Sequence, residues 1–474
     1  VDPLDVRYNV IQWVHRSTRG WSYGSSVSDP RTGEIIKGHV SLGSLRIRQD
    51  FMIALGLTEA PFDPNNNKEY AALELALSRI RQLSAHEIGH TLGFAHNFAA
   101  SAESRTSVMD YPHPYLTLEN DKINYSKAYE TGIGSWDKVS VGYAYSDFPD
   151  HIDESKELNL LLENSLKEGH LFISDSDARP IGGAHPKAHL WDNGSSATDE
   201  LNSLMQIRSK ALNQLSLNHI KQGAPYSDLE DLFVPIYLLH RYQVEAVVKM
   251  IGGVNYNYAT KGSIPFSVEV VSPTQQRNAL LEYLNALSPK ALKIPSHLNK
   301  LLHPRSFSNP RTRENFLSQT GVTFDYLGIA TSLSDAIIGM LLHPERANRL
   351  VMQFGFDKNQ LSLKETLNIL VNNHFKRTLR DSHENQLNEI VKGSILKHLM
   401  HLGQSSLASS ITKATIYEQL EVLDRWLAGQ SESNFSNFYR MEIQNYYDNP
   451  SGFNLSLSKR LPDGSPIGTF SCDY

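Results

Sequence analysis

The chain has 474 residues, of which 40% are hydrophobic and 20% charged, with a net charge of −6 at pH 7. That length predicts two or three domains, and the composition excludes a disordered or fibrous protein. The acidic balance offers no basic face for nucleic acid, and no apolar run reaches the ~18 residues of a membrane span. The single cysteine, Cys472, excludes an intrachain disulfide and shows no base partner for catalysis.

Residues 7–50 are predicted to be β-strands. The segments RYNVIQWV (7–14) and EIIKGHVSLGSLRI (34–47) are rich in β-branched and aromatic residues. The segment between them that reads SDPRTGE (28–34) carries turn residues, so the two flanking segments are expected to pair.

A helix is predicted from about Lys68 to Gly93. Apolar residues recur at helical spacing before His86, and Gly93 suits the left-handed position that follows a helix. SVMDYPHPY (107–115) predicts a tight turn, and GSWDKVSVGYAY (134–145) a short amphipathic helix.

From about residue 155 to 455 the pattern is mostly helical. The strongest helix is LEDLFVPIYLLHRYQVEAVVKMIGG (229–253), expected to kink or start at Pro235 and to end at its two glycines. Ser362 and Glu365 form a capping box before another helix, and the tail (461–474) is loop-like. The pattern as a whole predicts an α+β protein.

The segment HEIGHTLGFAH (86–96) carries the chemistry. His86 and His90 lie four residues apart, so on a helix both imidazoles point to one place. His96, beyond the helix-breaking Gly93, can return as a third ligand. Zinc held there would lower the pKa of a bound water to roughly 7, and Glu87 could take the proton as that water attacks a carbonyl.

Solvent-facing histidines on an ordinary helix are the alternative. With 29 glycines and 19 histidines among 474 residues, demanding one of each at two further fixed positions lowers the odds of a chance match about four-hundredfold. The metal site is therefore favoured.

The same segment matches HExxHxxGxxH, so the chain resembles the metzincin metalloproteases. SVMDY follows at the distance of their methionine turn, and residues 134–145 resemble the helix that they place after it. Residues 28–43 resemble their strand pair whose outer member lines the cleft. The segments DVRYNVIQWVHRSTRGWSYG and AHPKAHLWDNG also resemble a group of large bacterial zinc-dependent metzincin-type proteases.

The resemblance implies one catalytic zinc, and it assigns a role to each matching residue. Met109 would support the floor of the site, and Tyr111 stands where astacins and serralysins have a tyrosine that binds zinc and steadies the oxyanion; a tyrosine packed at a turn is the alternative. Asn97 departs from the best-known subfamilies and indicates a separate branch. The zinc ligands would be His86, His90 and His96, with Glu87 as the general base.

The resemblance also implies an organisation. Residues 1–150 would form the metzincin-like catalytic core, a twisted mixed sheet with the active-site helix, and residues 151–474 a mostly α-helical region that walls or caps the cleft. Metzincin domains begin with a strand and a helix for which there is no room before residue 7. We therefore expect a longer natural precursor and an extracytoplasmic location in a bacterium. We also expect apolar sheet surface left uncovered, unless part of residues 155–455 takes the place of the missing helix.

The implied function is zinc-dependent endopeptidase activity, with the peptide or protein substrate bound as an added strand on a sheet edge, for which residues 35–44 are the candidate. One alternative is a degenerate protease scaffold used for binding, against which the intact Glu87 and three histidines speak. A zinc hydrolase of a non-peptide amide is the other, because its water-activating groups would be the same.

Three further groups have weaker patterns. His185, His189 and Asp192 have ligand-like spacing for a second metal, although a polar loop near the cleft is favoured. Asp175 and Asp177 hint at calcium, against an ordinary solvated turn. His398 and His401 are expected to be solvated on a helix face.

Overall fold

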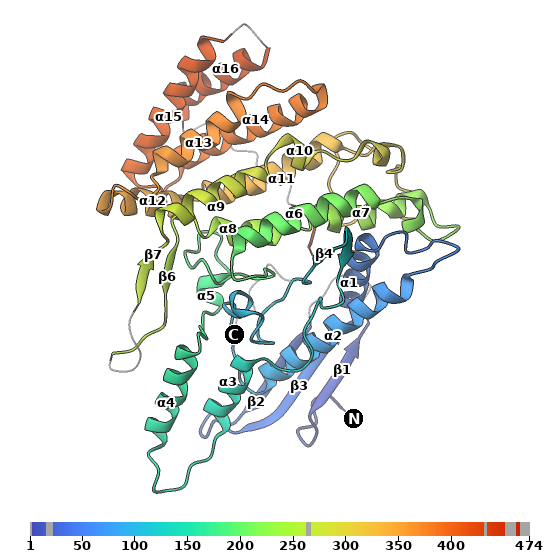
Figure 1. Ribbon diagram of the computed structural model, residues 1–474, viewed down its shortest axis with the longest axis vertical. Helices are drawn as coiled ribbons and strands as arrows, with labels where there is room; N and C mark the ends of the chain where they lie inside the picture. Colours follow the sequence, from blue (N-terminus) through green and yellow to red (C-terminus); the bar gives the residue numbers. More distant parts are fainter. Residues whose placement is uncertain (1, 16–21, 262–266, 431–433, 451–460, 465–474) are drawn as a thin grey trace.

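The computed structural model describes residues 2–15, 22–261, 267–430, 434–450 and 461–464. The molecule is elongated, with a small sheet towards one end and the last helices at the other (Figure 1). The sheet has three strands in the order β1-β3-β2. β1 (Val10–Val14) runs parallel to β3 (Ile35–Gly43), and β2 (Tyr23–Ser28) runs antiparallel to β3.

The strand predictions need two corrections. The two segments expected to pair do pair, as β1 and β3, but they run parallel, and the predicted turn at 28–34 joins β2 to β3 instead. β3 is therefore central, so the expectation that residues 35–44 form a sheet edge is wrong. Residues 44–50 are not strand either, because α1 (Ser44–Leu57) begins at Ser44 and buries one side, including Ile53 and Leu57, in the core.

The long helix α2 (Glu69–Thr91) lies across the sheet, as Figure 1 shows. Two glycines permit the close approach. A Cβ at Gly24 in β2 would collide with the carbonyl oxygen of Glu87, and one at Gly38 would lie 3.1 Å from the Cβ of Thr91. The helix stops as predicted, because Gly93 has a φ of +87° in the left-handed region.

The rest of the described chain is mostly helical, as predicted. Its α-helices are α3 (Ser135–Tyr145), α4 (Glu154–Lys167), α5 (Asp175–Ala178), α6 (Ala197–Gln214), α7 (Leu229–Tyr237), α8 (Arg241–Val248), α9 (Pro273–Asn285), α10 (Pro289–Leu292), α11 (Tyr326–Leu341), α12 (Pro344–Phe356), α13 (Leu363–Phe375), α14 (Ser382–Gln404), α15 (Ser410–Ala428) and α16 (Asn434–Asp448).

Short 3-10 helices and hairpins connect the longer elements. The 3-10 helices are η1 (Ala100–Glu103), η2 (Leu217–His219), η3 (Tyr226–Asp228) and η4 (Ser296–Lys300). One hairpin joins β4 (Thr117–Glu119) to β5 (Lys122–Asn124), and another joins β6 (Val254–Tyr256) to β7 (Val268–Val270).

Local signals in the sequence place several helix ends. The hydroxyl of Ser362 accepts a hydrogen bond from the backbone of Glu365 at the start of α13, as the capping box predicts. The predicted helix over 229–253 is two helices, α7 and α8, and Pro235 lies inside α7. Gly252, with a φ of +65°, follows α8.

The largest hydrophobic core joins both parts of the chain. Ile53, Leu57 and Leu116 from the first 150 residues pack with the buried faces of α6–α16. In the described part of the chain, the stretch Tyr326–Phe356 has the length and composition of a membrane span, but it consists of α11 and α12, and 56% of its apolar window is buried. Both helices contribute to this core.

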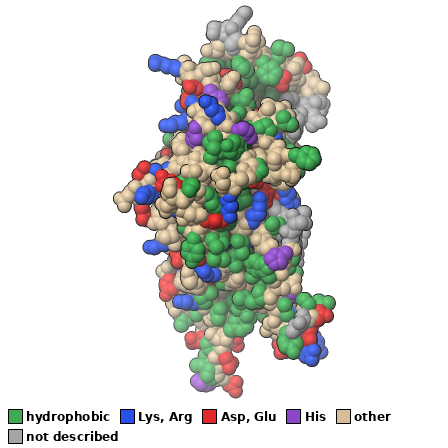
Figure 2. Space-filling view, turned by 90° about the vertical axis from the view of Figure 1, so that its right-hand side faces the viewer, with side chains coloured by type: hydrophobic (Ala, Val, Ile, Leu, Met, Phe, Trp, Pro, Cys, Tyr) green, Lys and Arg blue, Asp and Glu red, His purple; other side chains and the backbone are tan. Residues whose placement is uncertain are grey.

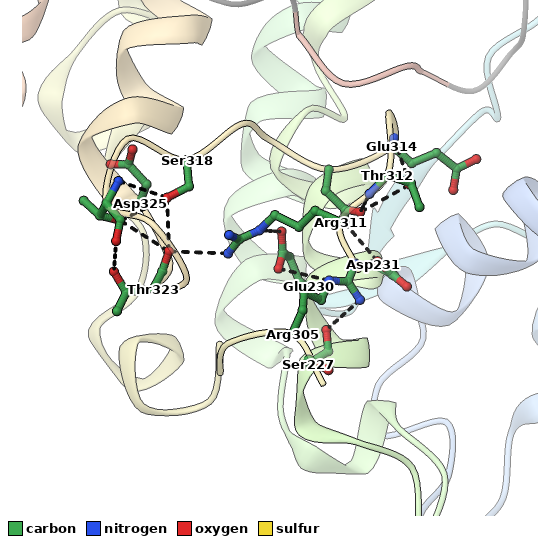
Figure 3. A network of polar contacts seen from close by, with 12 residues as sticks. Ser227, Glu230, Asp231, Arg305, Arg311, Thr312, Glu314, Ser318, Thr323 and Asp325 are labelled. Atoms are coloured by element: carbon green, nitrogen blue, oxygen red, sulfur yellow. Dashed lines mark hydrogen bonds and ion pairs between the residues drawn. The ribbon is translucent and has the colours of Figure 1, made fainter. Parts of the chain in front are cut away.

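A buried ion-pair network fastens the loop over residues 303–325 to α7 (Figure 3). The side chain of Glu230, 2% exposed, lies 3.4 Å from Arg305 and 3.2 Å from Arg311. Asp231 pairs with Arg305 and accepts a hydrogen bond from Asn315 at 3.0 Å. Since α7 packs on α1, the network braces the contact between the helical region and the sheet end.

Apolar side chains are exposed at the outer strand. Ile11 and Trp13 of β1 are 62% and 40% exposed, and β3 is the neighbour of β1 among the described strands. Figure 2 views the molecule from this side and shows hydrophobic side chains gathered over its lower half. The predicted uncovered apolar sheet surface is therefore present.

Candidate metal centre

Three imidazoles converge at the end of α2. Nε2 of His90 lies 3.1 Å from Nε2 of His86 and 3.1 Å from Nε2 of His96. His86 and His90 are one helical turn apart, and the reversal after Gly93 returns His96 to them. Ligand atoms of all three lie within 4.8 Å of one another, which makes them the one such group found in the described ranges.

Each ring is held through its other nitrogen. Nδ1 of His86 lies 2.6 Å from the carbonyl oxygen of Val108, and Nδ1 of His90 lies 2.9 Å from that of Phe94. Nδ1 of His96 lies 2.9 Å from Oδ2 of Asp175. Acceptors at the three Nδ1 atoms leave the Nε2 atoms available to a metal, the arrangement that metal-ligating histidines normally show.

The protonation of the cluster also fits a metal. Burial lowers the pKa of His86 well below its ordinary value and that of His90 to about 4, and the neighbouring imidazoles act in the same direction. Neutral imidazole is the form that ligates, so the two rings are ready for zinc at neutral pH. A nitrogen-only set of three ligands suits zinc with one position left open.

Glu87 is on the face of α2 that packs against β2, and it is 4% exposed. Its carboxylate accepts a hydrogen bond from the backbone N–H of Gly24 in β2. Burial raises the pKa of Glu87 to about 7, against the opposing charge of Arg79. A carboxyl group in this range can both take and give a proton near neutral pH.

Met109 packs against the turn of α2 that carries His86 and His90. A Cβ at Gly89 would collide with its sulfur, so the methionine fills the space beside the helix between His86 and His90. The turn is fixed from α3, where the carboxylate of Asp137 accepts a hydrogen bond from the backbone N–H of Val108 at 2.9 Å. Met109 is 2% exposed and sits where the sequence predicts a supporting methionine.

Asn97, the departure from the best-known subfamilies, has a structural role. Its backbone N–H donates to the carbonyl of Met109 at 3.1 Å. Its side-chain amide donates to the carbonyl of Leu171 at 2.9 Å, and its oxygen accepts from the backbone of Ile173 at 3.2 Å. Asn97 thus joins the third histidine, the methionine turn and the segment before α5.

Tyr111 packs against the histidines. Its ring centroid is 5.3 Å from that of His86 and 4.8 Å from that of His96, and the ring stacks on Trp191 at 5.3 Å. Nη2 of Arg179 lies 3.5 Å from the tyrosine hydroxyl. Tyr111 therefore lies beside the site, where the sequence analysis expected it, and its catalytic role stays a prediction.

The other predicted metal groups do not assemble in the described residues. His185 and His189 are buried, but His185 contacts the carbonyl of Tyr256 at 3.0 Å and His189 lies 3.5 Å from Glu245. They lie with Asp192 in the irregular segment between α5 and α6, and the three form no cluster of ligand distance.

The remaining candidates have other roles or lie outside the structure. Asp175 holds His96 and Arg179, and Asp177 accepts hydrogen bonds from Tyr256 and Tyr258. His398 is 5% exposed, so the expectation that it is solvated is wrong: α14 packs on α11 and turns it inward. Cys472 lies outside the described residues.

Sequence reasoning missed two residues of the site. Asp175 reaches His96 from 79 positions away, and burial of its carboxylate is outweighed by the hydrogen bond from His96 and the charge of Arg179, which lower its pKa. Trp191 stacks on Tyr111 with a φ of +62°, a strained value for a bulky residue. The local sequence around each residue drew attention to it, but nothing there indicates its contact with His96 or Tyr111, because those partners are far away in the chain.

A family model described as Met-zincin matches residues 68–382, which is more than half of the chain. The matched range starts just before α2 and ends at the first residue of α14, so it includes the three histidines, Glu87, Met109 and Tyr111. It also spans both of the parts predicted from the sequence. Neither the curated proteins nor the solved structures give a match to the chain.

Proposed function

Since the chain belongs to the Met-zincin family, we propose that it is a zinc-dependent endopeptidase in which Glu87 is the general base. The family itself points to a zinc metallopeptidase. The observation that carries the proposal further is the convergence of three anchored histidines beside a buried glutamate whose pKa is raised to about 7.

His86, His90 and His96 would hold the zinc. The bound ion would polarise the substrate carbonyl and make a water acidic enough to attack it at neutral pH. Glu87 takes the proton of the attacking water and returns it to the leaving amine, for which a pKa near 7 is suited. Tyr111, beside two of the ligands, would donate a hydrogen bond to the oxyanion as it forms.

The edge strand next to the site is β2, and we propose that it binds the substrate. Its Gly24 N–H faces Glu87, so the edge of β2 that pairs with no other described strand borders the catalytic groups. A peptide added antiparallel to this edge would be held mainly by backbone hydrogen bonds, which places few demands on its sequence. We also propose that the enzyme is bacterial and acts outside the cytoplasm.

The structure bears on the two alternative functions. A degenerate scaffold would have no reason to keep Glu87 in hydrogen-bonding contact with β2 beside three anchored histidines. A hydrolase of a non-peptide amide would use the same groups, but a sheet edge bordering the site favours an extended peptide.

Metal analysis and turnover together test the proposal. The parent protein should bind one zinc ion per chain and hydrolyse peptides, and His90→Ala should lose both properties. Glu87→Ala should keep the zinc and lose turnover by orders of magnitude. A parent that binds no zinc, or a Glu87→Ala variant that cleaves as fast as the parent, would refute the proposal.

A further inference from the structure

We propose that Asp175 is a positioning residue for the metal: its carboxylate fixes the ring of His96 and strengthens zinc binding from a segment of the chain outside the histidine motif. This inference rests on the proposed zinc site. It starts from the contact between Nδ1 of His96 and Oδ2 of Asp175, at 2.9 Å.

Asp175 gives His96 a support that the other two ligands lack. His86 and His90 have backbone carbonyls at Nδ1, whereas His96 has a carboxylate. A carboxylate acceptor fixes the proton on Nδ1, turns the lone pair of Nε2 to the metal, and raises the basicity of the ligand. A hydrogen bond to an ionised acceptor is also roughly twice as strong as a neutral one.

The position of the carboxylate is determined by the surrounding backbone. The segment 171–174 lies beside residues 97–98, with the N–H of Phe98 donating to the carbonyl of Ile173 at 2.8 Å. At the other end of α5, the ammonium group of the buried Lys249 donates to the carbonyl of Ala178 at 2.5 Å. Asp175 is therefore held against His96 from both sides.

Arg179 completes the arrangement. It pairs with the other carboxylate oxygen of Asp175, and its guanidinium lies 5.6 Å from the ring centroid of Tyr111. One carboxylate thus separates a guanidinium from the metal ligands. If Asp175 were removed, His96 would lose its acceptor and the positive charge of Arg179 would lie unbalanced beside a dication site.

A control residue lies two positions away on the same short helix. Asp177 is half-buried like Asp175, but its carboxylate accepts hydrogen bonds from Tyr256 and Tyr258 and not from His96. Substitution at Asp177 therefore changes the local charge and fold to a similar degree without touching a ligand.

The experiment measures zinc affinity by competition with a chelator, and the spectrum of bound Co²⁺, in the parent and in the variants Asp175→Ala, Asp175→Asn and Asp177→Asn. Asp175→Ala should raise the zinc Kd about 10- to 100-fold, and Asp175→Asn, which keeps an acceptor oxygen without its charge, should raise it less. Both should alter the Co²⁺ spectrum, while Asp177→Asn should leave the Kd within about twofold.

The thermal unfolding of the metal-free proteins separates positioning from folding, because a structural role would lower the midpoint without metal, and a positioning role would not. If Asp175→Ala fails to fold, Asp175→Asn carries the test. Parent-like Kd values in the Asp175 variants that fold, with the parent binding zinc, would overturn this inference alone. A parent that binds no zinc would overturn the proposed function together with it.

Discussion

The sulfur of Met109 occupies the space that a side chain at Gly89 would need. Gly89 lies on α2 between His86 and His90, the first two proposed metal ligands. Met109 lies on the turn whose neighbouring carbonyl, that of Val108, contacts Nδ1 of His86. The packing of one residue against the other therefore sets the distance between the helix and the turn. A substitution at this contact should therefore change the affinity for zinc.

Gly89→Ala should force the turn away from α2. Overpacking of this kind typically costs about 1–3 kcal/mol, so the free energy of unfolding of the metal-free protein should fall by that amount and zinc affinity should weaken. Urea unfolding and chelator competition measure the two effects. Gly393→Ala is the matched control, because this glycine lies inside α14 with open space at its Cβ position and should gain stability. A Gly89→Ala variant as stable as the control would refute the account of this contact.

Features that depend on residues close together in the sequence were predicted correctly, whereas features that depend on distant residues were not. The histidine spacing, the end of α2 at Gly93 and the cap at Ser362 depend on neighbours within a few residues, and each is found where the pattern predicts it. Strand β2 lies within the residues 7–50 predicted to be strands but was not singled out, because YGSSVS is rich in glycine and serine, which have little strand preference, and its place depends on β3. Asp175 was read as a solvated turn residue because its partner His96 is 79 positions away.

The edge strand gives a test of substrate binding. Since the N–H of Gly24 points to Glu87, and alternate residues of an antiparallel strand point their N–H groups the same way, the N–H of Ser26 should also face the open edge. Ser26→Pro removes that donor without breaking a bond to β3. It should lower kcat/KM about tenfold through a higher KM, since 1.4 kcal/mol of lost binding is tenfold.

Ser26→Ala serves as the control, because it removes the hydroxyl and keeps the backbone donor. When peptide hydrolysis is measured at equal zinc content, kcat/KM should be about tenfold lower for Ser26→Pro than for Ser26→Ala. Equal kcat/KM values for both would exclude the edge of β2 as the surface that binds the substrate backbone.

Tyr111→Phe should keep zinc, because the three histidines remain. The ring would still stack on Trp191, so the change removes only a hydroxyl that lies 3.5 Å from Arg179. If the hydroxyl donates to the oxyanion, kcat should fall by roughly 10²–10³ with a smaller change in KM. Steady-state kinetics and zinc analysis give both values. An unchanged kcat would leave Tyr111 a packing residue.

Lys249 should make stability depend on pH. Burial lowers its pKa to about 7 from an ordinary 10.5, so between these values the unfolded chain holds a proton that the folded chain does not. The free energy of unfolding should therefore rise with pH over this range, by at most about 1.4 kcal/mol per pH unit from this group, and the contribution is lost as pH falls towards 7.

The comparison with Lys249→Met isolates this effect. The variant leaves the carbonyls of Ala178 and Ala188 without their donor, a loss that does not depend on pH. Urea unfolding of both proteins at pH 7 and pH 9 should show the difference widening in favour of the parent at pH 9. A difference that stays the same at both pH values would contradict the burial of Lys249 as a titrating group.

Hydrolysis of peptide bonds by His86, His90, His96 and Glu87 acting together is the activity we propose. An unbiased peptide-library digest, read by mass spectrometry and run with the zinc-loaded parent and with Glu87→Ala at equal zinc content, tests it most directly. We expect internal cleavage of extended peptides by the parent and almost none by the variant. Equal cleavage by both proteins, or no cleavage by a zinc-loaded parent, would contradict it.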